Sequence, residues 1–289
     1  MANNGYLNKL HGELLDIIQE IDNVCSSHGL KYYLIGGTLL GAVRHKGFIP
    51  WDDDLDIAMP RDDFEKFVKI ANNSLNNSYE LQWITTNDEY WQVFAKVSKK
   101  HTLFKERILD RFTPIGIFVD IFPLDLSSDY FSKLERKKRW IVRINTLIWS
   151  KNSHEKGFKN VFRRMVARLL PTVLLQNIMI RIMKGAKKYG QTHYANFGSQ
   201  YSIQKQTMPI GWFGDGVNLE FEGRSFKAPI EYAKVLASIF GPSYLELPPE
   251  EKRRCHYPEK VIFSDGEEMV FETPKHIVTI KEQEKTDSI

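Results

Sequence analysis

The chain opens with a pattern typical of an amphipathic helix. Between residues 7 and 28, apolar side chains recur at intervals of three and four, which places them on one face of a helix. These side chains are Leu10, Leu14, Ile17, Ile18, Ile21 and Val24. Gly29 follows directly and is expected to end the helix.

Beyond this helix, short apolar runs alternate with helical spacings up to about residue 125. Strands are predicted at 32–35, 55–59, 79–84, 92–98 and 117–122. Helices are predicted at 38–43 and 62–71, followed by a polar loop at 72–78. An α/β or α+β domain is favoured, because strands and helices alternate along the same segment.

The second half of the chain has a different pattern. Residues 131–190 are mostly helical in their spacing, and residues 211–228 carry short strand and turn signals. A further helix is predicted at 232–240, ended by Gly241 and Pro242.

Charge is distributed unevenly between these parts. The 289 residues carry a net charge of +4, yet residues 131–190 contain 16 Lys or Arg and only two acidic residues. A basic segment on an acidic body indicates contact with a membrane surface, a nucleic acid or another polyanion. Trp140, Trp149 and Phe162 are interleaved with the basic residues, which favours an anionic bilayer surface. A solvated helix face is the alternative, whereas no recognition motif supports nucleic acid.

The sequence indicates a cytoplasmic protein, or one peripheral on the inner face of the cell membrane. Two cysteines, Cys25 and Cys255, are too few for a disulfide framework and lack the Cys-x-x-Cys spacing of a zinc site. The N-terminal residues lack a cationic segment followed by an apolar run. No stretch of about 20 apolar residues suits a transmembrane helix.

The densest polar signal is the run from Asp52 to Asp56. Residues two apart on a strand face the same side, so Asp54 and Asp56 are expected to converge, where their charges repel unless a cation intervenes. Carboxylate oxygens suit Mg²⁺ or Mn²⁺. Asp120 lies within an apolar strand and is the candidate third ligand of a phosphoryl-transfer site.

Other acidic residues have simpler explanations. A solvated turn explains Asp52 and Asp53 as well as a functional role does. Asp125 follows Pro123 and is interpreted as a cap or turn residue.

Gly36, Gly37 and Thr38 follow a predicted strand and open a predicted helix. Backbone N–H groups at a helix N-terminus bind anions, and glycine lets a phosphate approach closely. We therefore predict a phosphate site here, to which Thr38 adds a hydroxyl.

Cations near these residues are candidates for a pyrophosphate. Arg44, His45 and Lys46 lie between the glycines and the acidic residues, with a solvated loop as the alternative. Lys96 lies inside an apolar strand, from which it reaches either a phosphate oxygen or solvent.

The run from Gly36 to Asp56 resembles the central block of the LicD family, which includes fukutin and fukutin-related protein. Residues 118–125 and 240–249 also look like family motifs, and the resemblance spans roughly residues 7–126 and 205–258. One departure is Phe-Gly-Pro-Ser-Tyr at 240–244, where the family pattern is Tyr-Gly-Asp-Tyr.

The resemblance implies an α+β nucleotidyltransferase fold, with a small mixed sheet flanked by helices and a basic helical insertion. It implies metal-dependent transfer of choline-phosphate from CDP-choline to a sugar hydroxyl of a cell-surface glycan, releasing CMP. The acceptor would be a lipopolysaccharide or a teichoic-acid-like precursor. Ribitol- or glycerol-phosphate transfer from a CDP-polyol is the alternative within this class. A true nucleotidyltransferase and a non-catalytic membrane scaffold are alternatives of other classes.

The resemblance also assigns roles to individual residues. It implies that Asp54, Asp56 and Asp120 bind Mg²⁺ or Mn²⁺ and that residues 36–38 bind the donor phosphate. Asp120 is placed to accept the proton of the acceptor hydroxyl. His256 is either an acid, base or phosphate ligand, or a structural residue. A choline ammonium favours an aromatic cage, and the candidates are Trp51, Trp83, Tyr90, Trp91 and Trp212.

We accordingly divide the chain into four parts. Residues 1–128 are expected to form the catalytic core, and residues 129–200 a basic helical region that contacts the acceptor or a membrane surface. Residues 201–281 are expected to complete the catalytic domain. Residues 282–289 are charged and expected to form a loose tail.

Overall fold

A mixed sheet organises the fold in the computed structural model, which describes residues 4–84, 86, 90–106, 115–151, 157–253 and 258–271. Its main path runs β1-β2-β6-β4-β3, and β7 and β8 continue from β6. The strands are β1 (Tyr33–Leu34), β2 (Asp56–Pro60), β3 (Tyr79–Gln82), β4 (Ala95–Lys99), β6 (Phe118–Ser127), β7 (His193–Ala195) and β8 (Thr207–Pro209). Strands β2 and β6 run parallel, whereas the other pairs in this sheet are antiparallel.

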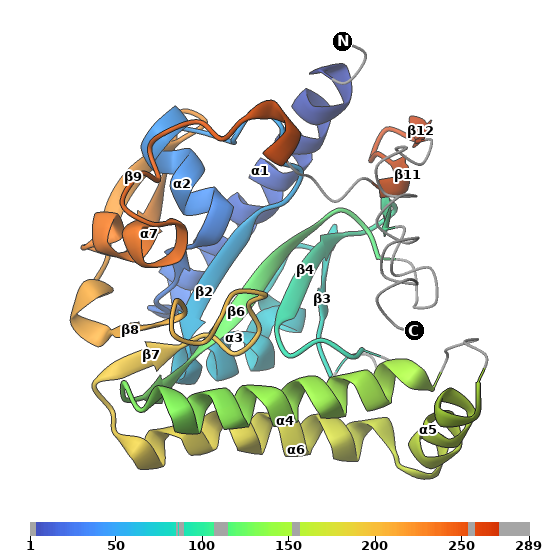
Figure 1. Ribbon diagram of the computed structural model, residues 1–289. Coiled ribbons are helices and arrows are strands. Elements are labelled where there is room, and N and C mark those ends of the chain that lie inside the picture. The colour runs from blue at the N-terminus through green and yellow to red at the C-terminus, as the bar shows by residue number, and fades with distance from the viewer. Residues whose placement is uncertain are drawn as a thin grey trace.

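Helices flank this sheet, which confirms the α+β class (Figure 1). They are α1 (Asn4–His28), α2 (Gly36–His45), α3 (Arg61–Ser74), α4 (Phe131–Ser150), α5 (Phe158–Leu169), α6 (Thr172–Lys184) and α7 (Tyr232–Phe240). Two smaller sheets complete the structure, one from β9 (Val217–Phe221) and β10 (Arg224–Ala228), the other from β5 (Leu103–Glu106), β11 (Pro258–Ile262) and β12 (Glu268–Val270).

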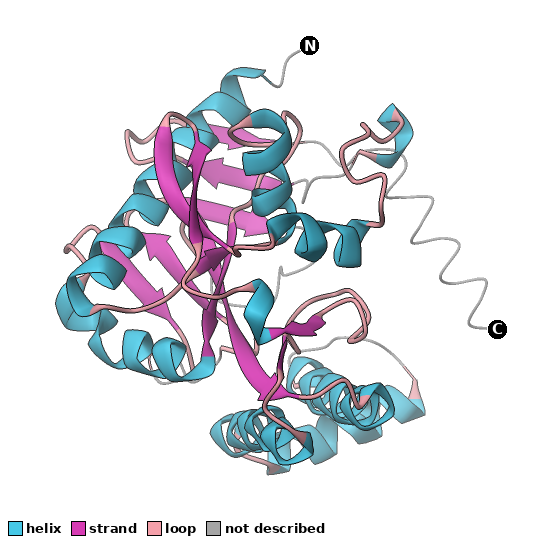
Figure 2. Cartoon of the chain, turned by 90° about the vertical axis from the view of Figure 1, so that its left-hand side faces the viewer, coloured by secondary structure: helices cyan, strands magenta, loops and turns pink. Residues whose placement is uncertain are grey.

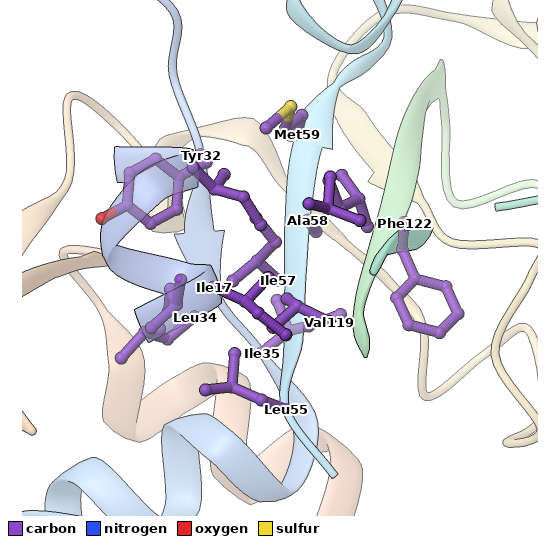
Figure 3. Packing of buried hydrophobic residues seen from close by; sticks show 14 of the residues in the cluster. Ile17, Tyr32, Leu34, Ile35, Leu55, Ile57, Ala58, Met59, Val119 and Phe122 are labelled. Carbon is purple, nitrogen blue, oxygen red and sulfur yellow. The ribbon is translucent and has the colours of Figure 1, made fainter. Parts of the chain in front are cut away.

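The main core lies where α1 and α3 cover one face of the sheet. The predicted apolar stripe of α1 is fully buried there, and so are Ile57, Val119 and Ile121 of the central strands. Figure 3 shows Ile17 packed with Ile57 and Val119, while Phe122 points away from them. Because side chains alternate across a strand, the residues between these core positions face the opposite side of the sheet.

Residues 131–190 are mostly helical, as the spacing predicts. Helices α4 and α6 lie side by side in Figure 1, and Figure 2 shows this layer nearly end-on, below the strands. The layer has its own buried cluster, which includes Leu134, Ile141 and Met179. Strand β6 reaches this layer, because its last residues pair with β7.

Several predicted boundaries were wrong. Helix α3 continues to Ser74, so the predicted loop at 72–78 is helical in its first three residues. Strand β6 continues beyond residue 122 to Ser127, because β7 supplies hydrogen-bond partners for Asp125–Ser127. Helix α2 begins at Gly36, two residues before the predicted start. Cys25 is buried and free, and Cys255 and the tail at 282–289 lie outside the described residues.

Candidate active site

Three polar side chains line up across the centre of the sheet. Asp56 on β2 is the register partner of Asp120 on β6, which in turn pairs with Lys96 on β4. Side chains of paired residues on neighbouring strands share one face. These three therefore lie on the face opposite α1 and α3, because Ile57 and Val119 point into the core.

Lys96 forms a buried ion pair with Asp120. Its Nζ lies 2.6 Å from Asp120 Oδ1 and 3.3 Å from the centre of the Phe118 ring. The Lys96 side chain is only 3% exposed, so of its two predicted alternatives the extension to solvent is wrong. Burial raises the pKa of Asp120 to about 6, although the Lys96 charge opposes this rise.

The first turn of α2 lies against the acidic residues. Gly36 has a left-handed φ of 57°, and a Cβ there would lie 3.3 Å from Asp56 Oδ2. A Cβ at Gly37 would lie 2.7 Å from Asp52 Oδ2, which is too close without a shift of the Asp52 carboxylate. The Thr38 hydroxyl oxygen accepts the backbone N–H of Asp56 at 2.8 Å and so links α2 to the start of β2. Glycine at 36 and 37 therefore lets the backbone of α2 lie close to the carboxylates of Asp56 and Asp52.

Asp56, the first residue of β2, and the three aspartates before it, Asp52, Asp53 and Asp54, form one cluster of negative charge. Burial raises the pKa of Asp52 well above its usual value, and the neighbouring charges of Asp54, Asp53 and Asp56 raise it further. Asp53 is buried and Asp52 is half-buried, so the solvated-turn interpretation is wrong for both. Asp54 lies two residues before β2 rather than on it.

The carboxylates of this cluster are the type of ligand that a hard divalent cation prefers. Asp54 and Asp56 belong to the cluster that raises the pKa of Asp52, and the Asp54 charge also raises the pKa of Asp120. Repulsion between neighbouring carboxylates is relieved when a cation such as Mg²⁺ or Mn²⁺ binds between them. Among the described residues, however, no three His, Cys, Asp or Glu side chains already form a metal-binding group. One oxygen of Asp120, Oδ1, is paired with Lys96.

The segment before the acidic cluster is held by residues that the motifs did not indicate. Glu222, between β9 and β10, accepts the N–H of Phe48 at 3.0 Å, and its own N–H donates to the Lys46 carbonyl at 2.8 Å. His11 on α1 stacks on the Phe48 ring at 3.9 Å and contacts the Asp52 carbonyl at 2.8 Å through Nε2. A carbonyl only accepts, so His11 Nε2 carries the proton.

Arg44 and His45 lie in the last turn of α2, at the other end from the glycines. Arg44 donates to the backbone carbonyls of Tyr244 and Glu246 at 3.3 and 3.1 Å, and its Nε donates to His45 Nε2 at 2.9 Å. Arg44 thus anchors the loop that follows α7 and is not brought to the predicted phosphate site. Lys46 forms an exposed ion pair with Glu220.

The remaining predicted residues have separate positions. Asp125 is not a turn or cap residue: it lies within β6 and accepts two hydrogen bonds from Arg61 at 2.8 Å. His256 lies outside the described residues. Of the candidate choline cage, Trp83 and Tyr90 are buried in the core, while Trp51 carries the Arg253 guanidinium over its ring at 4.5 Å.

A groove of about 400 Å³ lies between α4 and the loop after β7. Its lining residues are Glu135, Lys138, Arg139, Val142, Arg143, Gln200, Tyr201 and Ser202. The acidic cluster acts electrostatically on Tyr201: burial raises the pKa of the Tyr201 hydroxyl, and the charges of Asp52, Asp54 and Asp56 raise it further. Lys138 holds the loop by donating to the carbonyls of Ser199 and Tyr201. Sequence patterns gave no signal for Tyr201, which is 145 or more residues from these aspartates in the chain.

Replacing Lys96 with methionine is expected to raise the pKa of Asp120 above about 6, because the substitution removes the charge that opposes the effect of burial. The carboxyl ¹³C shift of Asp120, followed by NMR in metal-free protein, measures this change. Between the unfolded pKa near 4 and the folded pKa, the native state holds a proton that the unfolded chain has lost. The contribution of Asp120 to stability therefore increases as pH falls through this window. An unchanged Asp120 titration in the variant would contradict the pairing.

Comparisons with known proteins relate the segment that carries these residues to one family. A family model described as LicD/FKTN/FKRP, nucleotidyltransferase domain, matches residues 29–152 and so spans the glycine turn, the acidic cluster, Lys96 and Asp120. The chain is 29% identical over 254 residues to the lipopolysaccharide cholinephosphotransferase LicD of Haemophilus influenzae, covering 84% of this chain and 92% of that protein. It is also 40% identical over 50 residues to human ribitol 5-phosphate transferase FKRP, covering 17% of this chain and 10% of that protein.

Proposed function

Because this chain belongs to the LicD family of phosphotransferases, we propose that it transfers choline-phosphate from CDP-choline to a sugar hydroxyl of a cell-surface glycan. The observation that carries this choice of donor is the similarity to a lipopolysaccharide cholinephosphotransferase over most of both chains. In the reaction, the acceptor oxygen forms a bond to the phosphorus that carries choline. The bond from that phosphorus to the CMP oxygen breaks, and CMP leaves.

Asp54, Asp56 and Asp120 would hold Mg²⁺ or Mn²⁺ on the face of the sheet opposite α1. When bound, such an ion neutralises the donor pyrophosphate and lowers the cost of the charge that builds up during transfer. The chain itself would contribute Gly36 and Gly37 in the first turn of α2, whose N–H groups we propose as donors to the donor phosphate oxygens at the positive end of the helix.

Asp120 is the proposed acceptor of the proton from the attacking hydroxyl. Its raised pKa, about 6, suits a group that takes up a proton near neutral pH. Lys96 would act as a positioning residue, since its ion pair fixes one oxygen of the Asp120 carboxylate. The groove beside Tyr201 is basic along α4, and Tyr201 is within the electrostatic reach of the acidic cluster, so we propose that the groove receives an anionic part of the acceptor.

A polyol-phosphate donor remains the second candidate within this family. It is favoured by the match to a ribitol 5-phosphate transferase, although that match covers a small part of both chains. The same carboxylates and glycines would serve either donor, because they would act on the donor phosphates rather than on the choline or polyol head group.

Incubation of the purified protein with Mg²⁺, a membrane-glycolipid extract and one CDP-linked donor is expected to release CMP from CDP-choline and not from CDP-ribitol or CDP-glycerol. Parallel reactions without the extract measure hydrolysis of the donor. Release of CMP from a CDP-polyol alone would replace choline with that polyol. An acceptor tagged with a nucleoside monophosphate, with pyrophosphate released from a nucleoside triphosphate, would instead identify a nucleotidyltransferase.

A further inference from the structure

Helix α5 presents an apolar face to solvent. Counted from Phe158, the positions i, i+3, i+4, i+7 and i+11 fall on one side of a helix. They are occupied by Phe158, Val161, Phe162, Met165 and Leu169, all of which are exposed. Phe158 is 86% exposed and Leu169 is 77% exposed. Ala167, on the opposite side, is the buried residue of α5.

This orientation is the reverse of that of an ordinary surface helix. Such a helix turns its apolar stripe towards the core, whereas α5 contacts α4 and buries Ala167, which lies on the side opposite its apolar stripe. Val173 and Leu174, at the start of α6, extend the exposed apolar surface. Figure 1 shows α5 at the far end of the α4 and α6 pair, away from the sheet. Exposed apolar surface gathered in one place marks an interaction site.

Basic residues flank this apolar face on both sides. At about 100° per residue, Lys159 falls on one flank and Arg168 on the other, and both are exposed. The sequence contains no Asp or Glu from residue 156 to residue 214. A helix with an apolar centre and basic flanks is the pattern of helices that lie in the interface of an anionic bilayer.

We propose that α5 is a membrane-docking helix, whose apolar face enters an anionic lipid surface while its basic flanks contact the lipid phosphates. The membrane-contacting surface that the sequence predicts for residues 131–190 is thereby assigned to one helix. A second copy of the chain fits less well, because face-to-face pairing would bring like charges together. Among the described residues, no single helix has the length and hydropathy to span a membrane. The pair formed by α5 and Thr172–Tyr189 has them in length and composition, but its two helices meet at a bend of 92°. Docking in the plane of the interface needs no such span.

The test is vesicle co-sedimentation of the full chain, with neutral phosphatidylcholine vesicles or with vesicles that also contain phosphatidylglycerol. Binding is expected only with the anionic lipid. A triple variant, Phe158→Ser, Phe162→Ser and Leu169→Ser, is expected to bind at least about 100-fold more weakly, since it loses three large side chains from the buried face. The variant Lys159→Gln and Arg168→Gln is expected to bind about 30-fold more weakly.

The matched control replaces Leu245, Leu247 and Val270 with serine. These are three large apolar side chains that are exposed elsewhere on the protein. The control is expected to bind anionic vesicles like the wild type. Equal binding by the α5 variant and the control, or no binding by the wild-type chain, would overturn the proposal. Concentration-dependent dimerisation that the α5 variant abolishes, without vesicle binding, would assign the face to a second copy. None of these outcomes depends on the reaction at the active site.

Discussion

Replacing Asp54 or Asp56 with asparagine is expected to reduce CMP release at least 100-fold (about 3 kcal/mol or more), because each change removes an anionic oxygen from the proposed metal site. The folded protein is expected to be as stable as the wild type or more stable. The reason is repulsion within the cluster, since the charges of Asp54 and Asp56 raise the pKa of the neighbouring Asp52. CMP assays and urea unfolding of the same preparations measure the two effects together.

The matched control is Asp62→Asn, which removes an exposed carboxylate from the first turn of α3. It is expected to retain CMP release. If Asp54→Asn retained wild-type release as well, the acidic cluster would not be the catalytic centre. If both cluster variants unfolded, the aspartates would have a structural role instead.

Replacing Arg61 with methionine is expected to destabilise the protein by about 3–5 kcal/mol, because the change leaves a buried carboxylate without its partner. Arg61 and Asp125 join α3 to β6, and their side chains are 7% and 1% exposed. Burial raises the pKa of Asp125 while Arg61 opposes the rise. Without Arg61 that pKa rises further, so the loss of stability should shrink as pH falls and Asp125 gains a proton. Urea unfolding at pH 7 and pH 5 measures both effects.

The double variant Arg61→Met and Asp125→Leu is expected to recover much of the lost stability, since neither charge is then buried alone. Lys31→Gln is the comparison at the surface, because Lys31 and Asp215 form an exposed ion pair of similar length. Surface pairs contribute little, so Lys31→Gln should unfold close to the wild-type midpoint. Equal effects of Arg61→Met and Lys31→Gln would show that burial of the Arg61 pair does not matter.

The spacing of apolar residues predicted those helices and strands that are long enough to show a regular period. Helix α7 has the predicted bounds, and the stripe of α1 is buried as its spacing requires. The glycine turn and the acidic run were predicted to act together, and the structure places Gly37 against Asp52. In contrast, β7 and β8 have three residues each, which is too short for a period to be recognised.

The sequence by itself determined the α+β class, the helical nature of residues 131–190, and the glycines and carboxylates of the candidate site. These features are local, because side-chain period and backbone freedom act within a few residues. Only the tertiary structure decided that Lys96 pairs with Asp120, that Asp125 pairs with Arg61, and that the apolar face of α5 points outward. The two pairings depend on strand register and helix docking between segments 24 and 64 residues apart. The exposure of the apolar face of α5 depends on which side of α5 is covered by α4. The spacing of apolar residues along α5 does not indicate where α4 packs.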